Sequence, residues 1–166
     1  MRIHRQKRLF HKPEDLLDMV IDVENYPKFI SFISSVRILK RETPTPNLEA
    51  LTVDVAIQYK FVSETFRSLA TADRENLCIK IEKSGHGGAV RSLKNTWVFH
   101  ELSDGSTQLD FDVDVTLKVA PLQFLIKSKM DSAARSIMNA FERRAQIVCD
   151  PAGDRDIDLR VGQVRV

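Results

Sequence analysis

The fold is decided by two adjoining stretches, QLDFDVDVTLK at residues 108–118 and PLQFLIKSKMDSAARSIMNAFERRAQIV at residues 121–148. In the first, apolar and polar residues alternate, which predicts a strand with one dry face and one wet face. In the second, the spacing lengthens to that of a helix. At 1.5 Å per residue this helix is about 40 Å long, enough to cross an entire sheet. Its apolar stripe comprises Leu122, Ile126, Met130, Ala133, Ile137, Phe141 and Val148.

The segments before residue 36 predict one strand and two short helices. Residues 1–10 are typical of a charged strand, and Pro13 followed by two acidic residues marks the start of a helix. Asn25-Tyr26-Pro27 interrupts this helix. The apolar segment 29–33 then supplies a second, shorter helix of one or two turns.

From Val36 onward the apolar period is two, which indicates a succession of strands. After the proline-containing turn at 43–47, the predicted strands are 51–61, 64–71, 77–83, 93–102 and 108–119. Their short connections favour a sequential antiparallel meander. The expected fold class is therefore α+β: a seven-stranded curved antiparallel sheet wrapped around a long C-terminal helix, with two short helices after the first strand. We expect one domain over residues 1–149 and a flexible tail at 150–166.

Composition narrows the class of protein. The sequence carries 25 basic and 23 acidic side chains, a formal charge of +2, so no DNA partner is expected. No stretch approaches the roughly 20 apolar residues that span a bilayer, and the charged start differs from a signal peptide. The two cysteines, Cys78 and Cys149, lie far apart and favour reduced thiols. The expected location is the cytoplasm, with peripheral contact to the inner membrane as an open alternative.

The expected site is an apolar cavity between the long helix and the sheet. One helix is about 10 Å wide, whereas seven strands at about 4.8 Å spacing are far wider, so part of the sheet is left for a ligand to cover. Each large apolar side chain, taken alone, is more typical of plain core. The candidate ligand-binding residues are Tyr26, Phe29, Phe32, Val55, Ile57, Tyr59, Phe66, Trp97, Phe99, Phe111, Val113, Met130, Ile137 and Phe141.

No motif for catalysis or metal binding is evident in the sequence. The four histidines stand singly, and residues 85–88 (GHGG) lack the lysine of a phosphate loop and predict a hairpin turn. We therefore expect no catalytic residue, no metal and no cofactor. A minority alternative is a cyclase or dehydratase that uses Tyr59, Asn95 or Arg67.

Three motifs resemble a known family. VIDVENYPKF at 20–29, LKNTWVF at 93–99 and MNAFERRA at 138–145 are similar to signatures of the coenzyme Q-binding and polyketide cyclase-like START family. The resemblance covers about residues 1–149 and implies the helix-grip (START-like) fold. It also implies a cavity that holds ubiquinone or a related prenyl lipid, for delivery to respiratory or biosynthetic enzymes.

The same family includes bacterial ribosome-associated toxins, so a ribosome-associated regulatory protein is the main alternative function. Basic residues cluster at the N-terminus (Arg2, Arg5, Lys7, Arg8) and recur on the long helix (Lys127, Lys129, Arg143, Arg144). If they gathered on one rim, they would favour contact with anionic lipid headgroups or ribosomal RNA.

Overall fold

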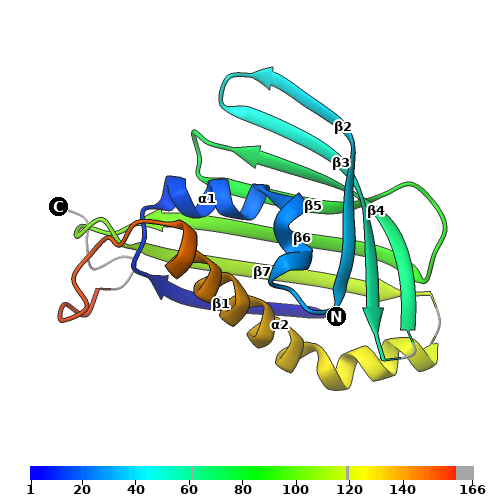
Figure 1. Ribbon diagram of the computed structural model, residues 1–166. Helices are drawn as coiled ribbons and strands as arrows, with labels where there is room; N and C mark the ends of the chain where they lie inside the picture. The colour runs from blue at the N-terminus through cyan, green and yellow to red at the C-terminus, as the bar shows by residue number, and fades with distance from the viewer. Residues whose placement is uncertain (61, 119, 160–166) are drawn as a thin grey trace.

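The computed structural model describes residues 1–60, 62–118 and 120–159 (Figure 1). The elements follow one another along the chain as a strand, two short helices, six more strands and a long helix. They are β1 (Arg2–Leu9), α1 (Pro13–Ile21), the 3-10 helix η1 (Val23–Lys28), β2 (Ile33–Thr45), β3 (Leu48–Tyr59), β4 (Val62–Asp73), β5 (Cys78–Ser84), β6 (Val90–Glu101), β7 (Thr107–Leu117) and α2 (Ala120–Val148).

All seven strands form one antiparallel sheet in the order β1-β7-β6-β5-β4-β3-β2. The strands from β2 to β7 pair consecutively as hairpins, and β1 closes the sheet beside β7. In Figure 1 the β2–β4 side of the sheet bends over the helices, while α1 and α2 lie on the concave face. The predicted α+β helix-grip architecture is confirmed.

The long helix α2 contacts β1, β7 and α1. Among its described residues, the side chains that it buries are Met130, Ala134, Met138, Ala140, Phe141 and Ala145. The predicted stripe is wrong at Ala133 and at Val148, which are both exposed. At 3.6 residues per turn, Ala133 lies about 60° from Met130 on the side away from Ala134. The side chains of Leu122 and Ile126 lie outside the described part of the chain.

The second short helix begins earlier than predicted, at Val23 rather than near Phe29. The backbone N–H groups of Asn25 and Phe29 bond to the carbonyls of Asp22 and Tyr26. The 3-10 turn therefore forms around Pro27 without the N–H that proline lacks. Residues 29–32, predicted as helix, form the turn that leads into β2.

The described part of the tail, residues 150–159, is bonded to the rest of the fold. The N–H of Asp154 donates to the carboxylate of Asp104 at 2.7 Å, and the guanidinium of Arg8 lies 2.7 Å from the same carboxylate. Gly153 adopts φ +90°, and a Cβ there would lie 2.6 Å from Ser106 Cβ, so this turn requires glycine. Tail flexibility remains a prediction, and residues 160–166 lie outside the described residues.

Candidate functional site

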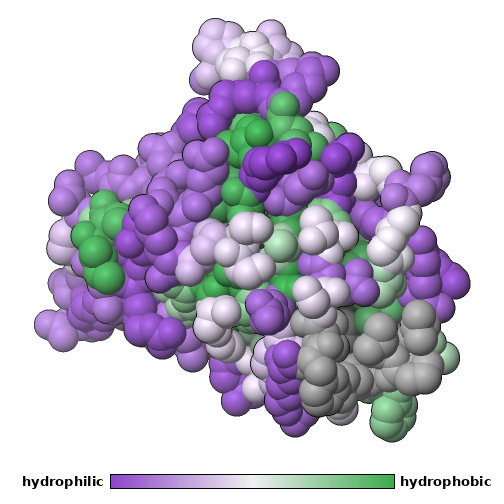
Figure 2. All heavy atoms as spheres, turned by 45° about the vertical axis from the view of Figure 1, so that its right-hand side comes forward, coloured by the Kyte–Doolittle hydropathy of each residue, from purple (hydrophilic) through white to green (hydrophobic). Residues whose placement is uncertain are grey.

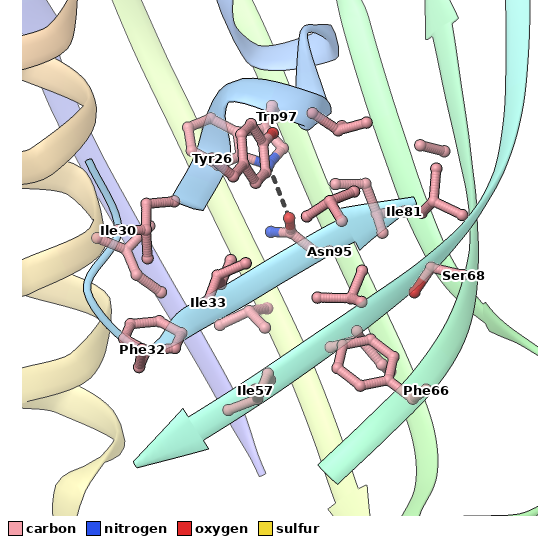
Figure 3. A pocket seen from close by; sticks show the side chains of 18 of the residues that line it. Tyr26, Ile30, Phe32, Ile33, Ile57, Phe66, Ser68, Ile81, Asn95 and Trp97 are labelled. Carbon is pink, nitrogen blue, oxygen red and sulfur yellow. Dashed lines mark hydrogen bonds between the residues drawn. The ribbon is translucent and has the colours of Figure 1, made fainter. Parts of the chain in front are cut away.

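A cavity of about 200 Å³ lies on the concave face of the sheet, beneath η1 and the middle of α2 (Figure 3). The strands supply its floor, because every second side chain of a strand points to the same face. The residues that line it are Val23, Tyr26, Ile30, Phe32, Ile33, Val36, Val53, Val55, Ile57, Phe66, Ser68, Ala70, Ile81, Leu93, Asn95, Trp97, Phe111, Val113, Ile137 and Phe141.

Ten of the fourteen predicted site residues lie in this lining, and four do not. Those that the fold brings together are Tyr26, Phe32, Val55, Ile57, Phe66, Trp97, Phe111, Val113, Ile137 and Phe141. Whether they contact a ligand remains a prediction. The four outside the lining are Phe29, Tyr59, Phe99 and Met130.

Each of these four lies outside the cavity for a local reason. Tyr59 ends β3 and is 51 % exposed. Phe99 is buried in the core, two residues beyond Trp97 on β6, a strand that α1 also contacts. Met130 is a buried residue of α2 that lies outside the lining. Phe29 packs edge-on against Phe141, with ring centroids 5.1 Å apart. Phe29 therefore supports the cavity wall from outside.

Ten lining residues were not among the predicted site residues, and most of them carry small or aliphatic side chains. The period of two contained a signal for several of them. Val53 shares a face with Val55, and Ser68 and Ala70 share a face with Phe66. The prediction favoured aromatic residues and left out these smaller side chains, although their small size leaves the space that makes the cavity.

Three of the four polar side chains in the lining are bonded to the protein itself. The indole N–H of Trp97 donates to Asn95 Oδ1 at 2.7 Å, and Asn95 Nδ2 donates to the carbonyl of Asp112 at 2.8 Å (Figure 3). The Tyr26 hydroxyl donates to the carbonyl of Val20. The fourth, the Ser68 hydroxyl, has no hydrogen-bond partner among the described residues.

The cavity provides an uncharged environment. Among the described residues that line it, none is an acid, a lysine, an arginine, a histidine or a cysteine. Burial, with a smaller contribution from the Asp22 carboxylate, raises the pKa of the Tyr26 hydroxyl far above its usual range, so the phenol stays protonated. A charged group brought into this space would lose its hydration without gaining a counter-charge.

The residues considered for a cyclase are not assembled into one site. Only Asn95 lines the cavity. Arg67 forms a bidentate pair with Asp54, at 2.8 and 3.2 Å, and this bond holds the pKa of the Asp54 carboxyl below its usual value. Tyr59 is exposed at the end of its strand.

Two other kinds of site are absent from the described part of the chain. Within residues 1–60, 62–118 and 120–159, no group of three or more His, Cys, Asp or Glu is placed to hold a metal ion. Among the helices formed by these residues, none combines the length and the apolar character needed to cross a membrane.

Apolar side chains reach the surface near the cavity. Figure 2 shows them in the middle of one face, surrounded by hydrophilic residues. On this side of the molecule lie the start of α2 and the turn between β3 and β4 (Figure 1). A band of apolar surface of this kind is typical of a binding site.

Comparison with known proteins agrees with this geometry. Residues 10–142 match the family model described as "Polyketide cyclase / dehydrase and lipid transport". Over 143 residues, covering 86 % of this chain and 94 % of the relative, the chain is 31 % identical to the ribosome association toxin RatA of Rickettsia prowazekii (strain Madrid E).

Solved structures show the same fold. The crystal structure of TTHA0849 from Thermus thermophilus matches with a TM-score of 0.75 and 16 % identity, covering 89 % of this chain and 98 % of that one. The solution structure of the 18 kDa protein CC1736 from Caulobacter crescentus matches with a TM-score of 0.71 and 26 % identity, covering 89 % and 97 %. The chain belongs to the polyketide cyclase / dehydrase and lipid transport family, with the START-like fold.

Proposed function

We propose that this protein binds a hydrophobic ligand, a quinone or a related prenyl lipid, in the cavity and passes it on without transforming it. The observation that carries the proposal is a 200 Å³ cavity with an almost wholly apolar lining on the concave face of the sheet. Transfer of apolar ligand surface from water into such a space is favourable by about 25 cal/mol per Å².

The size of the cavity indicates how a prenyl lipid would fit. Sites for drug-sized ligands measure about 300–1,000 Å³, so a cavity of 200 Å³ holds a ring or a short chain. A longer prenyl tail then extends toward the apolar surface seen in Figure 2. The head of such a ligand is shielded from water, and its tail is accessible at the surface. This arrangement suits transfer of the ligand to a membrane or another protein.

The proposal that the ligand is not transformed is supported by the lack of reactive groups. Hydrolysis or proton abstraction requires a base or a nucleophile within hydrogen-bond reach of the substrate. The described lining residues include no carboxylate, imidazole or thiol, and the phenol of Tyr26 already donates to Val20.

Release at a membrane surface is part of the proposal. Phe124, on the first turns of α2, is 76 % exposed. Lys127 and Lys129 are also exposed on this helix. An exposed aromatic residue beside basic residues suits peripheral contact with an anionic bilayer.

Extraction of the purified protein tests the proposal. The protein is made in quinone-replete cells, washed, extracted with organic solvent and analysed by mass spectrometry. We expect a quinone or another prenyl lipid in near-stoichiometric amount, and a much smaller amount from a variant in which Val55→Phe fills the cavity. An extract free of prenyl lipids from the wild type would contradict the proposal.

A second candidate function, association with the ribosome, is favoured by the 31 % identity to a relative named ribosome association toxin RatA. The N-terminal basic residues give it little support, because Arg2, Arg5, Lys7 and Arg8 all pair with acidic side chains. On α2, by contrast, Lys127, Lys129 and Arg143 are exposed, and none forms an ion pair with a described acidic residue.

Co-sedimentation with ribosomal subunits tests this second function. If it holds, the protein sediments with a subunit at low salt and is released as the salt concentration rises. Charge reversal of Lys127, Lys129 and Arg143 then abolishes sedimentation, whereas Val55→Phe leaves it intact. If the Val55→Phe variant alone no longer sedimented with the subunit, ribosome binding would depend on the cavity and not on the basic surface.

A further inference from the structure

The Ser68 hydroxyl is the one polar group of the cavity lining that has no partner among the described residues. Ser68 lies on β4, near the middle of the sheet, and is only 1 % exposed. Figure 3 shows its oxygen directed toward the space between the apolar side chains. A buried hydroxyl without a partner loses its hydrogen bonds to water and gains nothing in exchange. It therefore indicates a missing partner.

No other polar group of the described lining lies close to Ser68, and its cross-strand neighbour Lys83 donates instead to the Gly87 carbonyl at 3.1 Å. The nearest polar lining group on the sheet, Asn95, lies two strands away on β6, about 10 Å across the sheet, and is already bonded to Trp97 and Asp112. A water molecule beside Ser68 would contact mainly Val53, Ala70 and other apolar neighbours. Ordered buried waters usually make about three hydrogen bonds, which this site does not supply.

We infer that the Ser68 hydroxyl anchors the ligand through one hydrogen bond to a neutral carbonyl or hydroxyl oxygen. This inference rests on the proposed function and narrows it to a class of ligand. A plain hydrocarbon leaves Ser68 unpaired, and an ionised fatty acid brings a carboxylate into a lining with no cation. A quinone head, uncharged and bearing carbonyl oxygens, satisfies both conditions.

The orientation of the ligand follows from the same hydroxyl. Because Ser68 lies on the sheet floor and is almost wholly buried, the oxygen-bearing head enters first. The apolar tail then points away from the sheet floor. Trp97 lines the same cavity and is the only tryptophan in the sequence, so its fluorescence reports occupancy.

Titration of Trp97 fluorescence with three probes tests the inference: decylubiquinone, decylbenzene, which has the same chain and no oxygen, and decanoate. We expect the wild type to bind decylubiquinone most tightly and decanoate most weakly. Ser68→Ala should weaken decylubiquinone binding about 2- to 10-fold and leave decylbenzene unchanged. The control Ser92→Ala, at an exposed position on β6, should change neither.

Two variants of nearly equal shape separate the loss of the hydroxyl from a change in the shape of the cavity. Ser68→Thr keeps the hydroxyl and Ser68→Val replaces it with a methyl group, so we expect Thr to bind decylubiquinone more tightly than Val. Equal affinities in this pair, or equal losses for both neutral probes in Ser68→Ala, would overturn the anchor. Failure of the wild type to bind any of the probes would instead contradict the proposed function itself, and the anchor with it.

Discussion

The two ends of the concave face differ in how they are filled. At one end α1 lies over β4, β5 and β6, and Leu16, Leu17 and Ile79 are completely buried. At the other end, among the described residues, η1 and α2 face the same sheet, and a cavity of 200 Å³ remains. Both ends have the same alternation of apolar residues, so the difference lies in the helix that covers them. Where α1 packs on the sheet the concave face is core, and beyond α1 it is left open as a candidate site.

The largest expected effect comes from the packed end. Leu17→Ala removes a side chain that is 0 % exposed and should lower the free energy of unfolding by about 2–5 kcal/mol. The matched change Leu93→Ala, at a half-buried residue of the cavity lining, should cost about 2 kcal/mol or less, because the space beside it is already empty. Urea unfolding of both variants measures the difference. Equal losses would show that the two ends are packed alike.

The next effect concerns the segment that ties the tail to the protein. Asp104 is only 9 % exposed, and burial alone would raise its pKa. Hydrogen bonds from Ser106, the Asp154 N–H and Arg8 outweigh burial and hold that pKa well below its usual value of 3.8. A depressed folded pKa means that this stabilisation is complete above about pH 4 and is lost as the pH falls toward the folded value.

Asp104→Asn should therefore lower the free energy of unfolding at pH 7 by about 1–3 kcal/mol. The difference from the wild type should shrink as the pH is lowered through 4 and below, as measured by urea unfolding at each pH. The control Asp131→Asn removes an exposed carboxylate of α2 and should cost less than about 1 kcal/mol. A difference for Asp104→Asn that is independent of pH would exclude the ionised carboxylate as its cause.

The sequence predicted the layers of this fold well because strand and helix periods are local properties. Alternation over residues 108–118 placed Phe111 and Val113 on the concave face, where they line the cavity. The extent of the cavity was less predictable. Trp97 and Phe99 share a face of β6, yet only Trp97 lines the cavity, because the position of α1 along the sheet depends on tertiary packing. Ser68 shares a face of β4 with Phe66, so the period of two did indicate its position, but the prediction favoured aromatic side chains and left it out.

Filling the hollow end should separate ligand binding from stability. Val55→Phe places a ring in the 200 Å³ space and should weaken decylubiquinone binding at least about 10-fold, with the free energy of unfolding within about 1.5 kcal/mol of the wild type. The control Leu69→Phe adds the same ring at an exposed position of β4 and should leave binding unchanged. Normal affinity in Val55→Phe would place the ligand elsewhere.

The smallest expected effect tests where the site ends along the sheet. Tyr59 was predicted to bind the ligand but is exposed beyond the lining, so Tyr59→Ala should change the affinity for decylubiquinone by less than about twofold. Phe66, on the neighbouring strand, lies within the lining, and Phe66→Ala should weaken binding severalfold. Trp97 fluorescence measures both variants. A larger loss of affinity for Tyr59→Ala than for Phe66→Ala would contradict these bounds of the site. It would mean that the bound prenyl tail extends along β3 and contacts Tyr59 beyond the lining.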